Sequence, residues 1–116
     1  MAAPQVTGMA AVVGQYIREN GLDSQTGLSK RALAISLLMG TAIPMVDPDS
    51  GSYYPVFQQG AGLANVGAAV NAHSYILMNS DATESYADGK VKVELGDDPD
   101  RAGSYSFGFT VNNGRC

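Results

Sequence analysis

The side chains that could act as nucleophiles, bases or metal ligands are few in this sequence, and they do not form a catalytic set. His73 is the only histidine and Cys116 the only cysteine among the 116 residues. Acyl transfer to a serine needs a histidine base and an aspartate that orients it. Ser74 adjoins His73, but the two lack the sequence context of a nucleophile on a strand-to-helix turn. We therefore interpret His73 as a partly exposed residue of a linker.

The segment DPDSGS is the second candidate for chemistry, because Asp47, Asp49 and Gly51 have part of the spacing of a calcium loop. Such a loop needs further oxygen ligands and a closing glutamate, which the following YYPVFQ does not supply. A polar surface turn is the interpretation that the residues favour, both here and for GDDPD at 96–100. A single cysteine excludes an intrachain disulfide and a cysteine-rich metal site. No cofactor is predicted for this chain.

Composition limits the class of partner. Hydrophobic residues make up 45% and charged residues 16% of the chain, as in globular proteins. The formal net charge of −4 argues against nucleic acid or an anionic membrane as a partner. The longest apolar run, at 32–46, is interrupted by serine, glycine, threonine and proline, and falls short of the roughly 20 residues of a membrane span. The N-terminus lacks the basic start of a secretory signal.

The elements that must position these residues begin with a helix. Pro4 suits the first turn of a helix, and Gly21 suits its C-terminal cap. Apolar residues recur at helical spacing between them, at Val6, Met9, Ala10, Val13 and Ile17. The residues on the opposite face of this helix are small rather than charged, and this composition predicts a buried helix.

Two further helices are predicted. Ser29 is the expected N-cap of a helix that Gly40 ends, and Asn65 the expected cap of a short helix to Val70. Residues 23–27 are expected to form a polar loop, and 41–62 an irregular stretch. The apolar stripe predicted for the helix after Ser29 is Ala32, Ile35, Leu38 and Met39.

Strands are predicted in the last third of the chain. Ser74–Met78 is a short strand candidate, and the alternation at 90–95 and 104–111 predicts two more. The last of these is expected to be half-buried, with one apolar face. Helices followed by strands suggest two domains with a boundary near residue 72. The apolar positions of the two alternating stretches are Val91, Val93, Leu95, Tyr105, Phe107, Phe109 and Val111.

The opening segment MAAPQVTG resembles the sequence that follows the catalytic serine in subtilisin-like serine proteases, the subtilases. Gln5 replaces the usual histidine, which is not a member of the triad, and Thr7 replaces the usual small residue. The family places its nucleophile at the N-terminus of a buried helix, where free N–H groups favour the oxyanion. The matching residues, in register, are Met1, Ala2, Ala3, Pro4, Val6 and Gly8.

Two more segments are similar to the same family in the same order: LLMGTAIP (37–44) and QQGAGLANVGAAVNA (58–72). Residues 91–113 resemble, more weakly, the first strands of the fibronectin-III-like domain of lactocepin-like cell-envelope proteases. The resemblance implies an α/β fold class, with residues 1–72 as the C-terminal segment of a subtilisin-like peptidase domain containing three helices. Residues 73–116 would start a fibronectin-III-like β domain, and both parts would be incomplete.

The resemblance also implies where the chemistry lies. Subtilases order their triad as Asp, His and Ser, so the nucleophilic serine would immediately precede Met1 and no residue of this chain would be catalytic. The chain is thus expected to be an internal fragment of a secreted or cell-envelope serine endopeptidase, inactive alone. Its partner would be the upstream catalytic domain, and the whole protein would act on proteins or peptides. Calcium in the whole protein is left open.

Two alternatives remain open. One is a free-standing interaction module that binds a partner through its β-rich half. The other is a subunit that completes a split protease in trans. A coding sequence for Gly-Thr-Ser directly before Met1 would favour the fragment over both.

Overall fold

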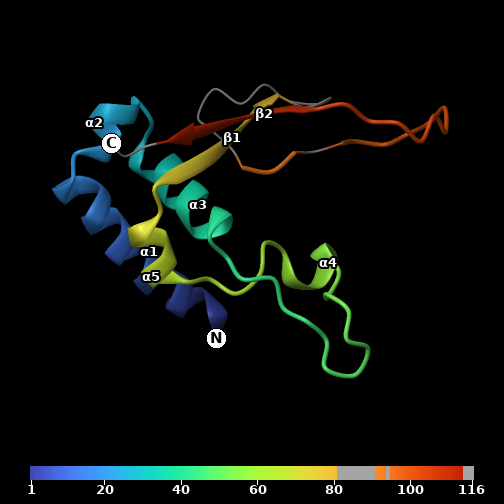
Figure 1. The fold of residues 1–116 in the computed structure, drawn as a ribbon, viewed down its shortest axis with the longest axis horizontal. Helices are drawn as coiled ribbons and strands as arrows, with labels where there is room; N and C mark the ends of the chain where they lie inside the picture. The colour runs from blue at the N-terminus through green and yellow to red at the C-terminus, as the bar shows by residue number, and fades with distance from the viewer. Residues whose placement is uncertain (81–90, 94, 114–116) are drawn as a thin grey trace.

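The computed structural model describes residues 1–80, 91–93 and 95–113, and within them helices are followed by a small sheet. Figure 1 shows most of the helices gathered into one layer, from which a β-ribbon (residues 74–80 and 95–113) and a long loop extend. The expected mixed α/β class is confirmed at this level. The elements are α1 (Ala2–Glu19), α2 (Leu22–Thr26), α3 (Lys30–Gly40), α4 (Val56–Gln59), α5 (Val66–Asn71), β1 (Ser74–Ser80) and β2 (Gly108–Asn113).

The first helix forms where the sequence predicts it. It ends at Glu19, and Gly21 follows in the left-handed conformation (φ 62°), with its N–H donating to the Arg18 carbonyl. Glycine adopts this conformation without steric cost, which explains the stop. Only Val13 and Ile17 of α1 are buried, so the expectation of a helix buried all round is not met by the contacts within this chain.

The predicted polar loop at 23–27 is wrong, because α2 occupies most of it. A second left-handed glycine, Gly27 (φ 73°), ends this helix, and the Thr26 hydroxyl donates to the Leu22 carbonyl at 2.7 Å. A five-residue helix between two glycines carries too little periodicity to be seen in the sequence.

The third helix has the predicted cap but a different buried face. The Ser29 hydroxyl accepts a hydrogen bond from the Ala32 N–H at 3.1 Å. The predicted stripe is wrong at Met39, which is exposed, whereas Ile35 and Leu38 are partly buried and Leu38 packs against the core. Ser36 is buried instead because its hydroxyl has a partner in the sheet. The residues of α3 that are buried are Ala32, Leu33, Ser36 and Leu37.

Residues 42–63, here called the arm, leave the helical layer and return to it. Ile43 and Leu63 close its base with two backbone hydrogen bonds of 2.9 Å, and Val46 pairs with Tyr53 farther out. The Gln59 side chain joins its two sides, since its amide donates to the Tyr54 carbonyl and its oxygen accepts from the Met45 N–H. The arm contains α4, so the predicted irregular stretch holds a helical turn that the sequence did not reveal.

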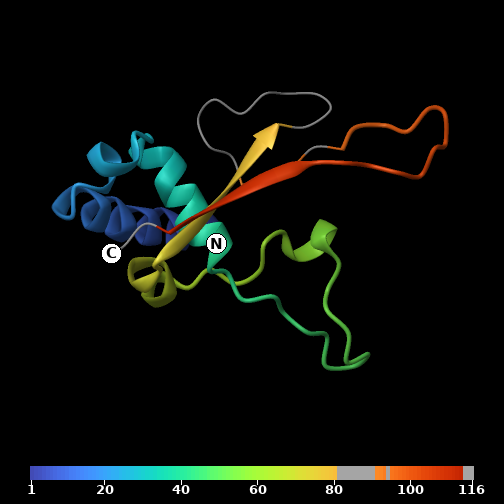
Figure 2. The same ribbon diagram turned by 45° about the horizontal axis from the view of Figure 1, so that its top comes forward.

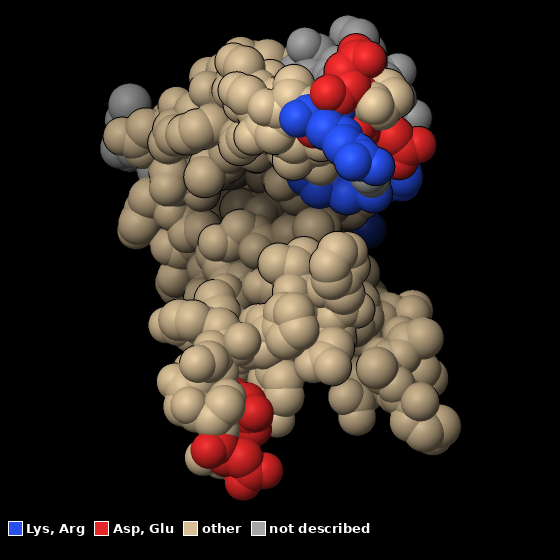
Figure 3. Space-filling model, turned by 90° about the vertical axis from the view of Figure 1, so that its right-hand side faces the viewer, with Lys and Arg blue, Asp and Glu red and all other residues tan. Residues whose placement is uncertain are grey.

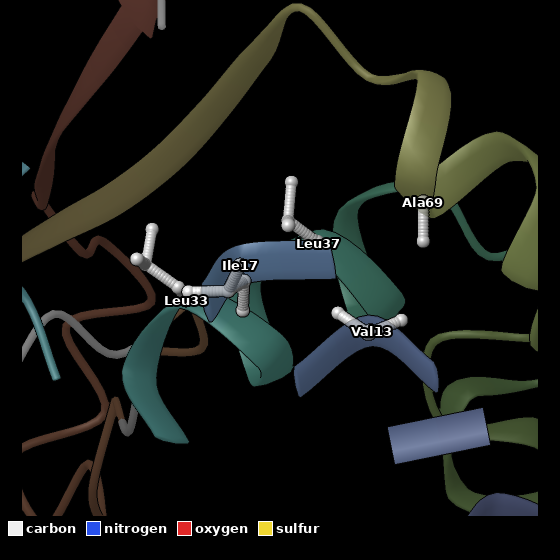
Figure 4. Packing of buried hydrophobic residues seen from close by; sticks show 5 residues of the cluster. All are labelled: Val13, Ile17, Leu33, Leu37 and Ala69. Atoms are coloured by element: carbon white, nitrogen blue, oxygen red, sulfur yellow. The ribbon is translucent and has the colours of Figure 1, made fainter. Parts of the chain in front are cut away.

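The core lies where three helices meet. Side chains from α1, α3 and α5 point toward one another in Figure 4, and α5 begins at the predicted cap, with the Asn65 side chain accepting from the Ala68 N–H. Burial of this cluster removes apolar surface from water, which is the main stabilising term available to a chain of this size. The cluster consists of Val13, Ile17, Leu33, Leu37 and Ala69.

The sheet is an antiparallel pair of strands, with Ile76 opposite Val111 and a register shift between Met78 and Ser80. The predicted strand at 74–78 is confirmed as β1, which packs on α3. The predicted strand at 104–111 begins later, as β2. Its apolar face is not half-buried as expected, since Phe109 is 54% and Val111 59% exposed.

No strand forms among residues 91–93 and 95, so the prediction for 90–95 is wrong over those positions; Lys90 and Glu94 lie outside the described residues, as does Cys116. Alternation of apolar and polar residues suits a strand with one face buried and one exposed. A strand also needs a neighbouring strand for backbone hydrogen bonds, which this pattern does not provide.

The chain exposes more surface than its mass requires. A folded monomer of 12.1 kDa has about 6,000 Å² of accessible surface by the usual scaling, whereas this chain has 7920 Å². Its radius of gyration is 15.8 Å, against about 13 Å for a compact domain of this length. Figure 2 shows the reason, since the arm and the ribbon project from the helical layer and leave its sides open.

Candidate functional site

The motif at residues 1–8 lies on the first two turns of α1. The helix starts at Ala2 with Met1 as its N-cap, no side chain caps it, and its first turn contains no acidic residue. Met1 is fully exposed. The N–H groups of Ala2 and Ala3 lack intrahelical acceptors because of their position, while Pro4 has no N–H to satisfy. This end of α1 therefore offers backbone donors and the positive end of the helix dipole to a neighbouring anion.

An apolar groove runs between α1 and α3 beside this motif; we call it the α1–α3 groove. Its open volume is about 370 Å³. Val6 belongs both to the motif and to the groove wall, so the two features are continuous. Lys30 is one of its lining residues, and the Lys30 Nζ is 3.8 Å from the Asp23 carboxylate. The lining residues are Val6, Ala10, Gly14, Lys30, Arg31, Ala34, Ile35 and Leu38.

His73 and Ser74 lie at the junction between α5 and β1, and both are exposed. They border a cavity of about 20 Å³, enough for roughly one water molecule. Among the described residues none that lines this cavity is acidic, so none of them would orient the imidazole as a triad aspartate does. The other lining residues are Tyr16, Leu22, Thr26, Leu33, Leu37, Ala72 and Tyr75.

Asp47 stabilises the turn at the tip of the arm. Its carboxylate accepts the Asp49 N–H at 3.0 Å, and its own N–H donates to the Ser52 carbonyl at 2.8 Å. The hydrogen bond from Asp49 and a second from the Ser50 side chain lower the pKa of Asp47 below its ordinary value. The turn is thus the polar surface turn that the sequence favours, with Gly51 in the left-handed conformation (φ 70°).

Asp98 holds a second turn in the same way. Its two carboxylate oxygens accept the N–H groups of Gly103 at 2.8 Å and Ala102 at 2.9 Å. These bonds, the one from Gly103 first, lower the pKa of Asp98. The backbone of Arg101 is left-handed (φ 53°), which the two bonds to the following residues compensate.

Charges are confined to small parts of the surface. Residues 2–17 contain no charged side chain, and residues 32–80 contain only Asp47 and Asp49. In Figure 3 basic and acidic groups gather at the upper right of the view, acidic groups alone lie at its lower end, and most of the surface between them is uncharged. Within the described ranges, no three histidine, cysteine, aspartate or glutamate side chains are placed to hold a metal ion. None of the described helices is long and apolar enough to cross a membrane.

The structure thus brings the motif residues Met1, Ala2, Ala3, Pro4, Val6 and Gly8 onto one helix end and keeps His73 and Asp47 separate from it. Sequence reasoning missed the α1–α3 groove. The signal for it was present in the small residues Ala10 and Gly14 of α1, read together with the apolar pair Ile35 and Leu38 of α3.

No protein-family model matches this chain, and no curated protein matches it either.

Proposed function

We propose that this chain is the C-terminal part of the catalytic domain of a subtilisin-like serine endopeptidase, secreted or held in the cell envelope. The start of a fibronectin-III-like domain follows it. In this proposal a serine directly before Met1 attacks the peptide carbonyl, and an upstream histidine and aspartate complete the triad. The observation that carries the proposal is that α1 begins at Ala2, so the motif residues occupy the first turns of a helix.

The role of this chain in that reaction is positional. A residue that precedes Met1 lies at the N-terminus of α1, where unpaired N–H groups and the helix dipole stabilise negative charge. Such donors are most effective where charge develops on the carbonyl oxygen in the transition state. Small residues at Ala2, Ala3 and Gly8 leave room for other parts of a larger domain to approach this end of the helix.

Open apolar surface along α1 supports the same proposal. Val6 is 46% and Val12 50% exposed, on a helix that carries no charged side chain over residues 2–17. A helix of this composition is normally covered on more than one side. In the proposed parent, the upstream part of the catalytic domain covers it, and protein or peptide substrates bind mainly to that upstream part.

A free-standing interaction module is the second candidate, favoured by the exposed aromatic side chains of the ribbon. Tyr105, Phe107 and Phe109 are each about half exposed. Exposed aromatic groups of this kind are enriched where proteins bind one another.

The test uses four proteins: the 116-residue chain, a polypeptide extended upstream through the proposed aspartate, histidine and serine, the extended form with alanine in place of the serine before Met1, and the upstream part by itself. Only the second should hydrolyse a peptide library. Activity of the 116-residue chain alone would contradict the proposal. If the separate upstream part becomes active only when the 116-residue chain is added, the chain is instead the subunit of a split protease. Specific capture of a partner by the ribbon, with no hydrolysis by any form, would favour the interaction module.

A further inference from the structure

Strand β2 (Gly108–Asn113) has a second backbone edge that faces no other strand among the described residues. The sheet there consists of β1 and β2 alone, so β2 pairs with β1 along one side only. In an antiparallel strand, successive residues direct their N–H and C=O groups to opposite sides. Every second residue of β2 therefore directs these groups away from β1. An edge of this kind is a template for pairing with a further strand.

The segment around β2 lacks the features with which proteins usually protect such an edge. Lysine, proline and bulges on the edge strand are common devices. Residues 102–113 contain no proline and no charged side chain, and the irregularity of the pairing lies on β1, between Met78 and Ser80. Uncharged segments of high β-propensity pair readily with copies of themselves. The apolar side chains that alternate along this segment and are about half exposed are Tyr105, Phe107, Phe109 and Val111.

This alternation makes the segment complementary to itself. When two copies pair antiparallel about a twofold axis centred on one residue, odd-numbered positions always lie opposite odd-numbered positions. Centred on Phe109, the pairing places Phe107 opposite Val111 of the second copy. The apolar side chains then gather on one face of the sheet, where cross-strand pairs of aromatic and β-branched residues are stabilising.

The acidic turn before β2 favours the antiparallel direction. Residues 97–101 contain three aspartates and one arginine, a surplus of negative charge. A parallel pair of strands would bring two such turns side by side, where like charges repel each other. An antiparallel pair places the two turns at opposite ends of the sheet. It also closes the assembly at two copies, because each β2 edge is used by the other.

We propose that the outer edge of β2 is a dimerisation edge, occupied by β2 of a second copy in the antiparallel direction. The product is a four-stranded sheet in the order β1, β2, β2, β1. The half-exposed aromatic side chains present roughly 300 Å² of surface, against about 800 Å² per partner in a standard interface. The dimer is therefore expected to be weak and to form at high protein concentration. The inference does not depend on the proposed protease, because neither hydrolysis nor its absence bears on this pairing.

Hydrogen exchange at two protein concentrations tests the pairing directly. In a monomer, only the amides that β2 directs toward β1 are protected, so protected and unprotected amides alternate along Gly108–Asn113. In the dimer the outward amides are bonded as well, and their protection should rise about tenfold or more between micromolar and millimolar protein. Outward amides that exchange at the same rate at both concentrations overturn the proposal. That holds whether the rate is fast, as at a free edge, or slow, as at an edge covered within the same chain.

A matched pair of lysine variants probes the same edge. Phe107 lies just before β2 and does not pair with β1, so Phe107→Lys leaves the β1–β2 ladder intact. The variant adds to the edge the charge with which proteins commonly block pairing. Phe57→Lys makes the same change on the exposed surface of the arm.

Sedimentation equilibrium compares these variants with the wild-type chain. At millimolar concentration the wild type should approach twice the 12.1 kDa chain mass. Phe107→Lys should raise the dimer dissociation constant by about tenfold or more, and Phe57→Lys should leave it unchanged. A monomeric wild-type chain at that concentration, or equal effects of the two variants, overturns the proposal.

Discussion

The Ser36 hydroxyl donates a hydrogen bond to the backbone carbonyl of Ile76 at 3.2 Å, across 40 residues of sequence. Ser36 is 1% exposed and is the buried polar residue at the interface of α3 and β1. The bond fixes the β-ribbon against the helical layer and explains why a serine, rather than the more apolar Ile35, faces inward. Helix α3 and the ribbon therefore pack together, although they lie on opposite sides of residue 72. The domain boundary expected near that residue stays a prediction.

Replacing this serine should weaken the contact between helix and ribbon. Ser36→Ala removes the donor, and the expected loss in the free energy of unfolding is about 1 kcal/mol. Urea denaturation at one fixed protein concentration measures it as a lower midpoint with an unchanged slope. Ser24→Ala, on the exposed side of α2, is the control and should change stability by less than about 0.5 kcal/mol. Equal shifts of the urea midpoint in the two variants would mean that the hydrogen bond from Ser36 does not stabilise the contact between helix and ribbon.

The N-terminal cap of α3 should contribute a similar amount to the free energy of unfolding. Ser29→Ala loses the acceptor for the Ala32 N–H and should lower the free energy of unfolding by about 1 kcal/mol. Ser29→Gly should lower it by only about a few tenths of a kcal/mol relative to wild type. Thermal unfolding followed at 222 nm compares the two. An alanine variant as stable as the glycine variant would mean that the cap bond does not stabilise the helix.

Gly62 should be the least replaceable glycine of the arm. Its φ is 117°, and an added Cβ would lie 2.5 Å from the Ile43 carbonyl oxygen, a backbone atom in the bridge that closes the arm. Gly62→Ala should therefore destabilise the chain by more than about 1 kcal/mol and weaken amide protection at Ile43 and Leu63. Gly67→Ala is the control, because Gly67 lies in α5 with room for a methyl group and alanine favours the helix. If protection at Ile43 survives Gly62→Ala, the arm is not closed by this pair.

Acid should release the turn held by Asp98. The N–H groups of Gly103 and Ala102 lower the pKa of this carboxyl in the folded state. A group with a depressed folded pKa contributes stability above its unfolded pKa and loses it as pH falls through the folded value. The Gly103 and Ala102 amide resonances should therefore move with a midpoint below the ordinary aspartate pKa of 3.8. In Asp98→Asn the same two resonances should lose this titration, and a midpoint at or above 3.8 in the wild type would contradict the geometry.

Sequence reasoning succeeded where local signals agree. Helix α1 has both apolar periodicity and a terminating glycine, and α3 and α5 each begin at a capping side chain, Ser29 and Asn65, that makes the predicted bond. It failed where structure depends on contacts distant in sequence. The inward turn of Ser36 is set by Ile76, which no local pattern reveals. For the same reason the α1–α3 groove, formed by residues about 20 to 30 positions apart, could not be read from either helix alone.

The short elements failed for a different reason. Helices α2 and α4 have five and four residues, fewer than two turns, so their apolar spacing carries no periodic signal. The alternation at Val91, Val93 and Leu95 has the period of a strand, but the described part of this stretch does not pair into a sheet. The helical start at residues 1–8 was predicted because it depends only on one helix, whereas the role of these residues beside a nucleophile stays a prediction.

We propose that the residue before Met1 is the nucleophile of a serine protease. Reaction of the upstream-extended protein with a fluorophosphonate, followed by peptide mapping, measures this most directly. We expect a single adduct on the serine that immediately precedes Met1, and no adduct on the 116-residue chain alone. An adduct on a serine within residues 1–116, or a folded extended protein that the reagent does not modify, would contradict it.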